Sequence, residues 1–497
     1  MSEAKQTKYL VLDSRIIEGT TGAKLTVGKA VKDRQNPLFT GDKPWEPNIS
    51  NGFPTVLWDE EDKLYKCWYN AWIIDKAVAT TPPEKRGDIS GFGSYLPDAV
   101  DSQPFPSRDS GVCYAISKDG IHWEKPDLGV VQFNGDKKNN LVFSAEAVPK
   151  MANASPDLPP SKARGPHGAG VFKDYREGDP AKLYKMVFRD YSPSEPETFY
   201  ISVAFSPDGL RWDSVPCPEI DPEADTHNNA FWAPELEKYV LITRRWSPDR
   251  RVGRCESLDF LKWTKPEVVL SNSKLGLKHQ IYSMPVFRYA NLYIGLPAIF
   301  NSDNDRVHTE LAWSPDTVKW YRINPGTPLI PNGDEKDDYD WGCIYTAHAI
   351  FLKDEIRIYY MGDANTHYSW RDSGLCLATL RPDGFVGYEP YSDNTSALIT
   401  TKPVICAGKS LCVSVDVRYG GSVQVESYDE RSQKLASSEP ITSQPAKWEW
   451  EYETNTEITD GVVTWKDGWD LSVMGDKKVQ LKFELNKATL YSFSFND

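Results

Sequence analysis

Short apolar segments separated by turn residues recur through residues 52–380. Each recurrence has an apolar segment, a turn, a second segment rich in Tyr and Leu, a loop, and a third apolar segment. Such segments between Gly, Pro, Asn and Asp residues predict β-strands joined by turns. The first segments lie at 52–59, 168–174, 229–235, 282–289 and 345–353, the second at 63–69, 182–188, 238–244, 291–298 and 355–362, and the third at 110–117, 199–206, 251–257, 308–314 and 373–380.

Four of the third segments run into the pattern Ser-x-Asp-x-x-x-Trp, which begins at Ser117, Ser206, Ser257 and Ser314. An incomplete fifth copy surrounds Asp383. An Asp in this position accepts hydrogen bonds from the amides of a turn, and the Trp can pack between neighbouring sheets. The pattern therefore predicts a turn to an outer fourth strand, one four-stranded blade per copy, and a five-bladed β-propeller.

The pattern changes near residue 395. Residues 396–497 alternate apolar and polar positions, as in SLCVSVDVRY and KVQLKFELN, between Gly, Asp and Asn turns. This alternation is typical of antiparallel sheets with one buried face, so we expect a C-terminal antiparallel β-sandwich over 396–497. We expect residues 1–395 to form the propeller, with the N-terminal segment closing the ring. The expected fold class is all-β.

The composition supports this fold and excludes some partners. The 497 residues include 17 Trp, 25 Tyr, 19 Phe, 33 Gly and 36 Pro, which suits many short strands joined by tight turns. No apolar run approaches the roughly 20 residues that cross a bilayer. The net charge is −14 with dispersed Lys and Arg, which offers no basic stripe to nucleic acid. We therefore expect neither a membrane nor a nucleic-acid partner, and the oligomeric state stays open.

The N-terminus and the cysteines bear on the cellular compartment. The first residues, MSEAKQTKYLVLD, lack the basic and apolar regions of a secretion signal. We expect a cytoplasmic protein, or a periplasmic or secreted one whose signal peptide has been removed. The eight Cys residues mostly lie within apolar segments and are expected to be buried thiols. Only Cys406 and Cys412 are placed for a hairpin disulfide.

In a propeller, the residues before each innermost strand and the loops between second and third strands share the face where the channel opens. Asp225 and Asp340 precede two innermost strands, and Asp190 ends a second strand beside Arg189. Carboxylates in one narrow funnel repel each other and are desolvated, which raises one pKa and keeps the other group ionised. Such a pair can act as acid and base. Asp225, Asp340 and Asp190 are therefore candidate catalytic residues, with turn capping as the alternative for each.

Other polar and aromatic residues map to the same face. An Arg can clamp a hydroxyl-bearing ligand, and an exposed Trp can stack on a sugar ring. Asp363 and Trp370 lie in the same loops, and ordinary rim positions remain the alternative for all of these residues. The candidate substrate-binding residues are Arg189, His167, His227, Asn228, His279, Tyr282, Arg244, Trp341, His367 and Trp72.

Two insertions lie near this face, at residues 75–109 and 136–166. The first is rich in Pro, Gly, Asp and Ser, and we expect it to cover the channel mouth. A blind-ended pocket of that kind favours attack on chain ends. Neither insertion contains a glycine-rich phosphate loop, an HExxH or a GxSxG, so nucleotide, zinc-protease and serine-hydrolase chemistry have no support.

The SxDGxxW turns, the segments FWAPE, HGAGVFKD and KLYKMVFRD, and the C-terminal β domain together resemble the five-bladed propeller glycoside hydrolases of families 32, 43, 68 and 117. The resemblance covers nearly the whole chain, as an architecture more than as a motif. It implies three carboxylates at the channel: a nucleophile or base, an acid, and a third that tunes the acid. This chain departs from the pattern, since Asn51 replaces an expected Asp and the Arg189-Asp190 pair lacks its following Pro.

The resemblance also bears on the acid and on cofactors. Family 117 implies that a histidine can serve as the acid, for which His167, His227 and His279 are candidates. His348, in the innermost strand of the fifth unit, resembles the axial histidine that faces a central cation or water in family 43. No cofactor is expected to be required, although calcium or another cation could lie in the central channel. Core packing is the alternative for His348.

We therefore expect an exo-acting glycoside hydrolase that removes a terminal sugar from an oligo- or polysaccharide, with an acid/base carboxylate pair in the propeller funnel. Asp225 is the first choice for the base or nucleophile. Two alternatives stay open. One is a noncatalytic carbohydrate-binding propeller, and the other is a glycoside phosphorylase that holds phosphate with Arg189, Arg244, Arg245 and His279. The sugar, the linkage and the stereochemical outcome do not follow from the sequence.

Overall fold

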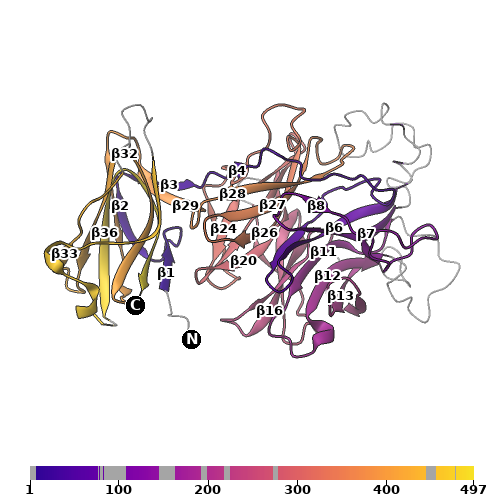
Figure 1. Cartoon of the computed structure of the whole chain (residues 1–497), viewed down its shortest axis with the longest axis horizontal. Helices are drawn as coiled ribbons and strands as arrows, with labels where there is room; N and C mark the ends of the chain where they lie inside the picture. Colours follow the sequence, from indigo (N-terminus) through magenta and orange to yellow (C-terminus); the bar gives the residue numbers. More distant parts are fainter. Residues whose placement is uncertain are drawn as a thin grey trace.

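The computed structural model describes residues 7–75, 78, 82, 108–144, 163–191, 199–217, 224–272, 278–443, 455–475 and 477–496. These residues are almost entirely β-strands and turns and form two lobes (Figure 1). Most of the first insertion and residues 145–162 of the second lie outside the described residues, so the expected cover over the channel stays a prediction. Among the described residues, no helical segment has the length and apolar character needed to cross a bilayer.

Four sheets of the first lobe, called the propeller-like lobe, are blades. Blade one contains β5 (Thr55–Asp59), β6 (Leu64–Asp75) and β7 (Arg108–Ser117), with the short β8 (Trp123–Glu124), β9 (Leu141–Ser144) and β10 (Ala163–Arg164). Blade two contains β11 (His167–Lys173), β12 (Tyr184–Tyr191), β13 (Phe199–Ser206) and β14 (Asp213–Cys217), with the 3-10 turn η2 (Pro180–Lys182). Blade three contains β15 (Asn229–Ala233), β16 (Lys238–Trp246), β17 (Arg250–Ser257) and β18 (Glu267–Leu270). Blade four contains β20 (Val286–Tyr289), β21 (Leu292–Gly295), β24 (Leu311–Ser314) and β25 (Tyr321–Ile323).

The fifth repeat is not a separate blade, so the prediction of five separate four-stranded blades was wrong. Its strands belong to a seven-stranded sheet in the order β19 (His279–Ser283), β22 (Ala298–Asn301), β23 (Arg306–Thr309), β26 (Cys343–Phe351), β27 (Ile356–Asp363), β28 (Gly374–Leu380) and β4 (Val31–Lys32). Three segments predicted as single strands of the fourth repeat are each divided between this sheet and blade four. Pro285 and Pro297 lie at two of the breaks, and proline has no amide hydrogen for a ladder bond. The inner halves therefore leave blade four, and β23 pairs with β26 in parallel.

The predicted turns after the third strands are confirmed in four copies. Asp119 Oδ1 accepts hydrogen bonds from the amides of Ile121 and His122 at 2.9 and 2.8 Å, and Trp123 Nε1 donates to the carbonyl of Gly120 at 3.2 Å. The same contacts recur in the copies that contain Asp208, Asp259 and Asp316. These bonds stay inside the turn, so the motif ends a strand without adding chemistry to the opposite face.

The second lobe, called the C-terminal lobe, is an eleven-stranded antiparallel sheet that contains the first and the last strands of the described chain (Figure 1). Its strands are β1 (Thr7–Leu10), β2 (Ile17–Thr21), β3 (Ala23–Val27), β29 (Val386–Pro390), β30 (Ser396–Thr401), β31 (Val404–Ile405), β32 (Ser410–Tyr428), β33 (Lys434–Ser437), β34 (Ile441–Thr442), β35 (Thr456–Val462) and β36 (Lys478–Asn496), with the 3-10 turns η4 (Lys466–Gly468) and η5 (Leu471–Val473). Buried Val, Leu and Phe side chains of β32 and β36 form its core. Cys406 and Cys412 are both buried thiols, so the expected disulfide between them was wrong.

The N-terminal segment serves both lobes. Residues 7–27 pair with β29, β30 and β36. β4 pairs with β28, the last strand of the fifth repeat, and Phe39 forms an isolated bridge with Leu375 of the same strand. β29 and β30 also lie in the C-terminal lobe, at residues 386–401. The sheet of the C-terminal lobe thus begins about ten residues before the boundary expected at residue 396 and includes the start of the chain.

The incomplete fifth copy of the motif connects the two lobes. The side chain of Asp383 is fully buried, and its Oδ2 accepts hydrogen bonds from Lys8 Nζ at 2.8 Å and from Ser414 Oγ and Ser492 Oγ at 2.7 Å. These three donors belong to the C-terminal lobe. Its Oδ1 accepts a hydrogen bond from Tyr289 OH of blade four at 2.5 Å. One carboxylate therefore bridges both lobes.

Asp383→Asn is expected to lower the free energy of unfolding by about 2 kcal/mol, because a buried ammonium loses a counter-ion. The matched control is Asp460→Asn. Asp460 pairs with the same Lys8 at 2.9 Å, but its side chain is 32% exposed, so we expect a loss of about 0.5 kcal/mol. Urea unfolding of both variants checks the difference. Equal losses would contradict a bridging role for Asp383.

Candidate functional site

Four side chains from blades two and three meet at one end of the propeller-like lobe. Asp225 contacts His167 Nε2 at 3.2 Å, Arg189 Nη1 at 3.0 Å and Arg244 Nη1 at 3.5 Å. We call these four residues the Asp225 cluster. The side chain of Asp225 is 47% exposed, whereas its three partners are at most 8% exposed. The carboxylate of Asp225 is therefore reachable from solvent, whereas its partners are not.

Sheet register and a tight loop place this carboxylate. His167 and Arg189 are register partners on β11 and β12, so their side chains lie on one face of blade two. The loop at 224–228 is held by Asn228, whose Nδ2 donates to three carbonyls and whose Oδ1 accepts from Thr243 Oγ1 at 2.7 Å. Gly168 has a φ of +63°, and a Cβ there would lie 1.6 Å from the carbonyl oxygen of Thr226. The loop can reach this position because residue 168 has no side chain.

The charges of the cluster keep Asp225 ionised. Burial would raise the pKa of Asp225, but Arg189, Arg244 and the hydrogen bond from His167 lower it well below its usual value. Burial lowers the pKa of His167, and Arg189 adds to this effect, although Asp225 opposes it. His167 is therefore a neutral hydrogen-bond donor to an ionised carboxylate near neutral pH. A histidine in this state is a poor candidate for the acid that family 117 implied.

A second group of polar and aromatic side chains lies beside the cluster, around Tyr282. The guanidinium of Arg244 lies 4.4 Å from the Tyr282 ring centroid, and that of Arg250 lies 5.5 Å away. His367 contacts the same ring edge-on at 4.9 Å. Asn51 Nδ2 donates to Tyr282 OH at 3.2 Å. Of these residues, Tyr282, Arg244 and His367 were predicted to bind substrate, and the structure brings all three together.

Asp363 is the carboxyl group of this region whose pKa is raised, to about 7. Burial is the main cause, and the charge of Arg371 opposes it. The side chain accepts hydrogen bonds from the amide of Asn365 at 2.9 Å and from Ser373 Oγ at 3.1 Å. The sequence placed Asp363 in a rim loop but gave no reason to choose it, because its desolvation follows from burial in the folded protein at the end of β27.

Asp340 does not join the cluster. Its Oδ2 contacts Lys32 Nζ at 2.7 Å and accepts a hydrogen bond from Tyr360 OH at 2.8 Å, and the side chain is 1% exposed. Lys32 lies on β4, the outermost strand of its sheet. Asp340 therefore binds that edge strand to the rest of the sheet. The contacts of its side chain are with Lys32 and Tyr360 and not with the Asp225 cluster, so a catalytic role for Asp340 stays a prediction that these contacts do not favour.

Asp190 lies beside Arg189 on β12 but on the opposite face of the strand, since successive side chains alternate. The buried Met186 and Phe188 share its face toward blade one, and burial together with the charge of Asp190 raises the pKa of Tyr200. Arg189 and Asp190 therefore do not act as a pair on one ligand. A catalytic role for Asp190 stays a prediction.

The remaining candidates fall into two groups. Trp72 stacks on His167 with ring centroids 5.0 Å apart and so borders the cluster. The amide of Asn228 is used inside the protein, as described above. Trp341 lies under the guanidinium of Arg306 at 4.5 Å, and His279 begins β19. No contact of Trp341 or His279 within the described residues joins them to Asp225.

His227 and His348 lie close to each other, and Phe53 contacts both His227 and His167 of the cluster. The ring centroids of His227 and His348 are 6.4 Å apart, and His227 lies 5.7 Å from the ring of Phe53. Burial lowers the pKa of His227 to about 3 and that of His348 to about 4, so both rings are neutral. In the described part of the chain, no three His, Cys, Asp or Glu side chains are grouped so that they could hold a metal ion. A cation at His348 stays a prediction that these contacts do not favour.

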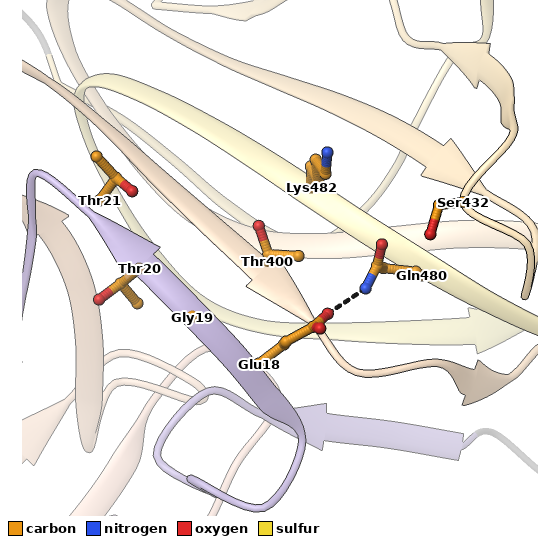
Figure 2. A pocket seen from close by; sticks show the side chains of 8 residues that line it. All are labelled: Glu18, Gly19, Thr20, Thr21, Thr400, Ser432, Gln480 and Lys482. Atoms are coloured by element: carbon orange, nitrogen blue, oxygen red, sulfur yellow. Dashed lines mark hydrogen bonds between the residues drawn. The ribbon is translucent and has the colours of Figure 1, made fainter.

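A polar recess lies elsewhere, on the C-terminal lobe. Figure 2 shows it between β2, β30 and β36, where Gln480 Nε2 donates to Glu18 Oε2. The lining residues are Glu18, Gly19, Thr20, Thr21, Thr400, Ser432, Gln480 and Lys482. This lining contains no aromatic ring and a single carboxylate, so it offers neither a stacking surface for a sugar nor an acid/base pair.

No family model and no curated protein matches the chain. Among solved structures, an N-acetylgalactosamine deacetylase from F. plautii in complex with blood group B trisaccharide is 14% identical, with a TM-score of 0.45 over 71% of this chain and 95% of that one. A member of the GH130 family of mannoside phosphorylases, which contains hydrolases that target beta-1,2 mannosidic linkages in Candida mannan, is 15% identical, with a TM-score of 0.43 over 72% and 95%. A glycosyl hydrolase from Bacteroides ovatus is 14% identical, with a TM-score of 0.43 over 71% and 94%. At such TM-scores, these likenesses identify neither a family nor an activity.

Gly168→Ala is expected to lower the free energy of unfolding by about 2–4 kcal/mol and to displace the loop that carries Asp225, because the new methyl group overlaps the Thr226 carbonyl. The matched control is Gly178→Ala, where an added Cβ meets nothing within 4 Å. Thermal unfolding compares the two variants. A Gly168 variant as stable as the Gly178 variant would contradict the tight packing of this loop.

Asp363→Asn is expected to become more stable relative to the wild type as the pH rises. The folded protein holds the proton of Asp363 up to a pH of about 7, whereas an unfolded Asp loses it near about pH 4. Wild-type stability is therefore lost across this window as the pH rises, and a neutral Asn does not incur that loss. Unfolding at pH 5 and at pH 8 measures the effect. A stability difference independent of pH would contradict the raised pKa.

Proposed function

We propose that this protein is a carbohydrate-active enzyme, a glycoside hydrolase whose reaction takes place at the Asp225 cluster. One observation carries the proposal: Asp225 is ionised and half exposed, although its partners are buried. A carboxylate held ready by buried donors and reachable from solvent suits the attack on an anomeric carbon or the activation of a water molecule. The buried donors fix its orientation before the substrate arrives.

Asp363 is the proposed acid of the reaction on the basis of its raised pKa, and Asp340 stays the alternative from the sequence. Acid/base catalysis needs two carboxyl groups whose pKa values are pushed apart. The pKa of Asp225 is lowered by its cationic neighbours, and that of Asp363 is raised to about 7 by burial. Below about pH 7, Asp363 therefore retains a proton while Asp225 has lost its own. Asp190, on the other face of β12, is the candidate for a third carboxylate.

Sugar binding is assigned to the side chains around Asp225. Trp72 and Tyr282 supply ring faces, and Arg189, Arg244 and His167 supply donors for hydroxyl groups. Removal of a terminal sugar rests on the first insertion, which was expected from the sequence to cover the channel mouth. Because most of that insertion lies outside the described residues, the sequence alone supports the exo-acting mode.

A second candidate function, a glycoside phosphorylase, is favoured by the two arginines beside Tyr282. A phosphorylase needs a site for phosphate next to the attacked carbon, and buried guanidinium groups can provide it. Release of sugar that requires inorganic phosphate would decide for this function. Binding of oligosaccharides without release of any sugar, with or without phosphate, would decide instead for a noncatalytic carbohydrate-binding propeller.

Asp225→Asn is expected to reduce kcat by about 10²–10⁴-fold with the fold retained, because the amide cannot act as base or nucleophile. Asp340→Asn is the matched control, since Asp340 is a buried carboxylate that contacts Lys32 and lies away from the cluster. It should lower the melting temperature and leave kcat within about threefold of the wild type. Sugar release from a panel of plant and algal oligosaccharides measures both. Near-normal turnover by the Asp225 variant would overturn the site assignment.

A further inference from the structure

Arg250 is a buried cation whose contacts in the described chain are neutral. Arg250 is the first residue of β17 and is 8% exposed. Nη1 donates to Gln280 Oε1 at 2.8 Å, Nη2 lies 3.4 Å from Tyr368 OH, and Nε has no hydrogen-bond partner. No carboxylate forms an ion pair with Arg250 in the described part of the chain. A guanidinium buried in this way is costly, unless a counter-charge arrives from outside.

Arg244 lies next to Arg250 and has only a partial counter-ion. The guanidinium groups of both residues lie near the ring of Tyr282. The ion pair of Arg244 is with Asp225, at 3.5 Å, and Asp225 is also paired with Arg189 and His167 at shorter distances. Arg244 Nη2 donates to the carbonyl of Tyr282 at 2.8 Å, and its Nε has no hydrogen-bond partner. Burial lowers the pKa of Arg244, and repulsion from Arg250 adds to this effect.

His367 completes the surroundings as a neutral ring, and its Nδ1 lies 3.8 Å from the Asp305 carboxylate. It is 5% exposed and packs between the rings of Tyr282 and Phe300 at 4.9 and 4.8 Å. Burial lowers the pKa of His367 well below its usual value, and the charges of Arg371, Arg250 and Arg244 lower it further. Burial and three nearby arginines therefore keep the imidazole of His367 neutral. A neutral imidazole can still donate one hydrogen bond to an anion.

Asp225 connects these arginines to solvent. Its side chain is 47% exposed and its Oδ2 lies 3.5 Å from Arg244 Nη1, so we infer that a solvent-borne group that reaches the carboxylate also approaches that guanidinium. The guanidinium of Arg250 lies near the same tyrosine ring as that of Arg244.

We propose that Arg244 and Arg250, with His367, form a subsite for an oxyanion beside Asp225. Guanidinium groups match the geometry of carboxylate, sulfate and phosphate oxygens, which all provide two or more acceptors to one planar fork. The inference rests on the proposed function in one respect: the oxyanion is taken to be part of the substrate or the attacking group of that reaction. It is either a carboxylate or sulfate group on the sugar, or a free phosphate that attacks it. The binding of the anion itself does not depend on catalysis.

Titration calorimetry with sodium sulfate, sodium phosphate, glucuronate and glucose tests the subsite. We expect the wild type to bind at least one of the three anions, and Arg250→Gln to weaken that binding by about tenfold or more. The matched control is Arg251→Gln. Arg251 is the next residue on β17, its side chain lies on the other face, and it pairs with Asp249 at 2.6 Å. The control should bind the anion as the wild type does.

The proposal is overturned if the wild type binds none of the three anions, or if Arg250→Gln and Arg251→Gln bind them equally well. Circular dichroism and thermal unfolding establish that each variant is folded. Should Arg250→Gln fail to fold, Arg250→Lys and Arg244→Lys are titrated instead. These variants keep the charge but lose the planar fork, so anion binding should weaken in both. Unchanged binding in both would equally overturn the proposal.

Turnover assays separate the sources of the oxyanion from failure of the proposed function. Sugar release from uronate-containing or sulfated oligosaccharides, but not from their neutral counterparts, assigns the subsite to the substrate. Release that requires inorganic phosphate assigns it to the attacking group. Release from neutral sugars without phosphate, together with no anion binding, would leave the hydrolase standing and remove the subsite. If the wild type binds an anion, Arg250→Gln does not, and no substrate releases sugar, the oxyanion subsite is supported and the proposed hydrolase activity is rejected.

Discussion

The ionic contact between Asp225 and side chains of two blades is the interaction on which the site depends. His167 and Arg189 belong to blade two and Arg244 to blade three, so the carboxylate is a counter-ion across a blade boundary. Buried cations need such a counter-ion, because desolvation would otherwise cost several kcal/mol. Asp225, which is proposed to act on a substrate, thus also holds blades two and three together at the site. A ligand that engages Asp225 must compete with the arginines, which couples binding to the packing of blades two and three.

Other aspartates of the fold have different structural roles, which depend on the sequence around them. Asp119 accepts hydrogen bonds from the amides of its own turn. Near Asp383, Arg381 replaces the serine that opens the other four copies, and the carboxylate turns to donors of the C-terminal lobe instead. Arg381 in turn contacts Asp416 and the carbonyl of Ile458 in that lobe. The change in sequence at the fifth copy therefore lets Asp383 and Arg381 bind residues of the C-terminal lobe, and these contacts link the two lobes.

Strand and turn positions could be predicted from the sequence because they depend on neighbours a few residues away. Apolar segments and the Ser-x-Asp-x-x-x-Trp turns predicted five blades, of which the structure contains four, and the alternating pattern of residues 396–497 predicted the C-terminal strands. The departure at the fifth repeat came from Pro285 and Pro297, which lie inside segments that otherwise predict continuous strands. Pairing of residues 7–27 with β29, β30 and β36 could not be foreseen, since strand partners distant in sequence leave no local signal.

The sequence could predict which residues lie on the channel face of the propeller, and so the candidate site was predictable only where residues on that face also contact one another. Position on that face brought Asp225, His167, Arg189 and Arg244 together, and it placed Tyr282 and His367 nearby. It grouped Asp340 with them as well, but the side chain of Asp340 contacts Lys32. It did not single out Arg250, the first residue of β17, because partners of opposite charge cannot be counted from sequence alone. Face position selects candidates, whereas burial and counter-charge decide what each one can do.

Net charge and local charge act in opposite directions here. The chain carries −14, which disfavours the approach of anions, although salt screens this repulsion beyond roughly 8–10 Å. Within that distance, Arg244 and Arg250 beside Tyr282 supply positive charge that can attract an anion. An anion therefore gains little from long-range attraction and must be drawn in by the neutral part of a larger ligand or by its own concentration. The proposed subsite therefore depends on short-range fit to the guanidinium groups, and the net negative charge of the chain disfavours polyanions whose other charges stay outside it.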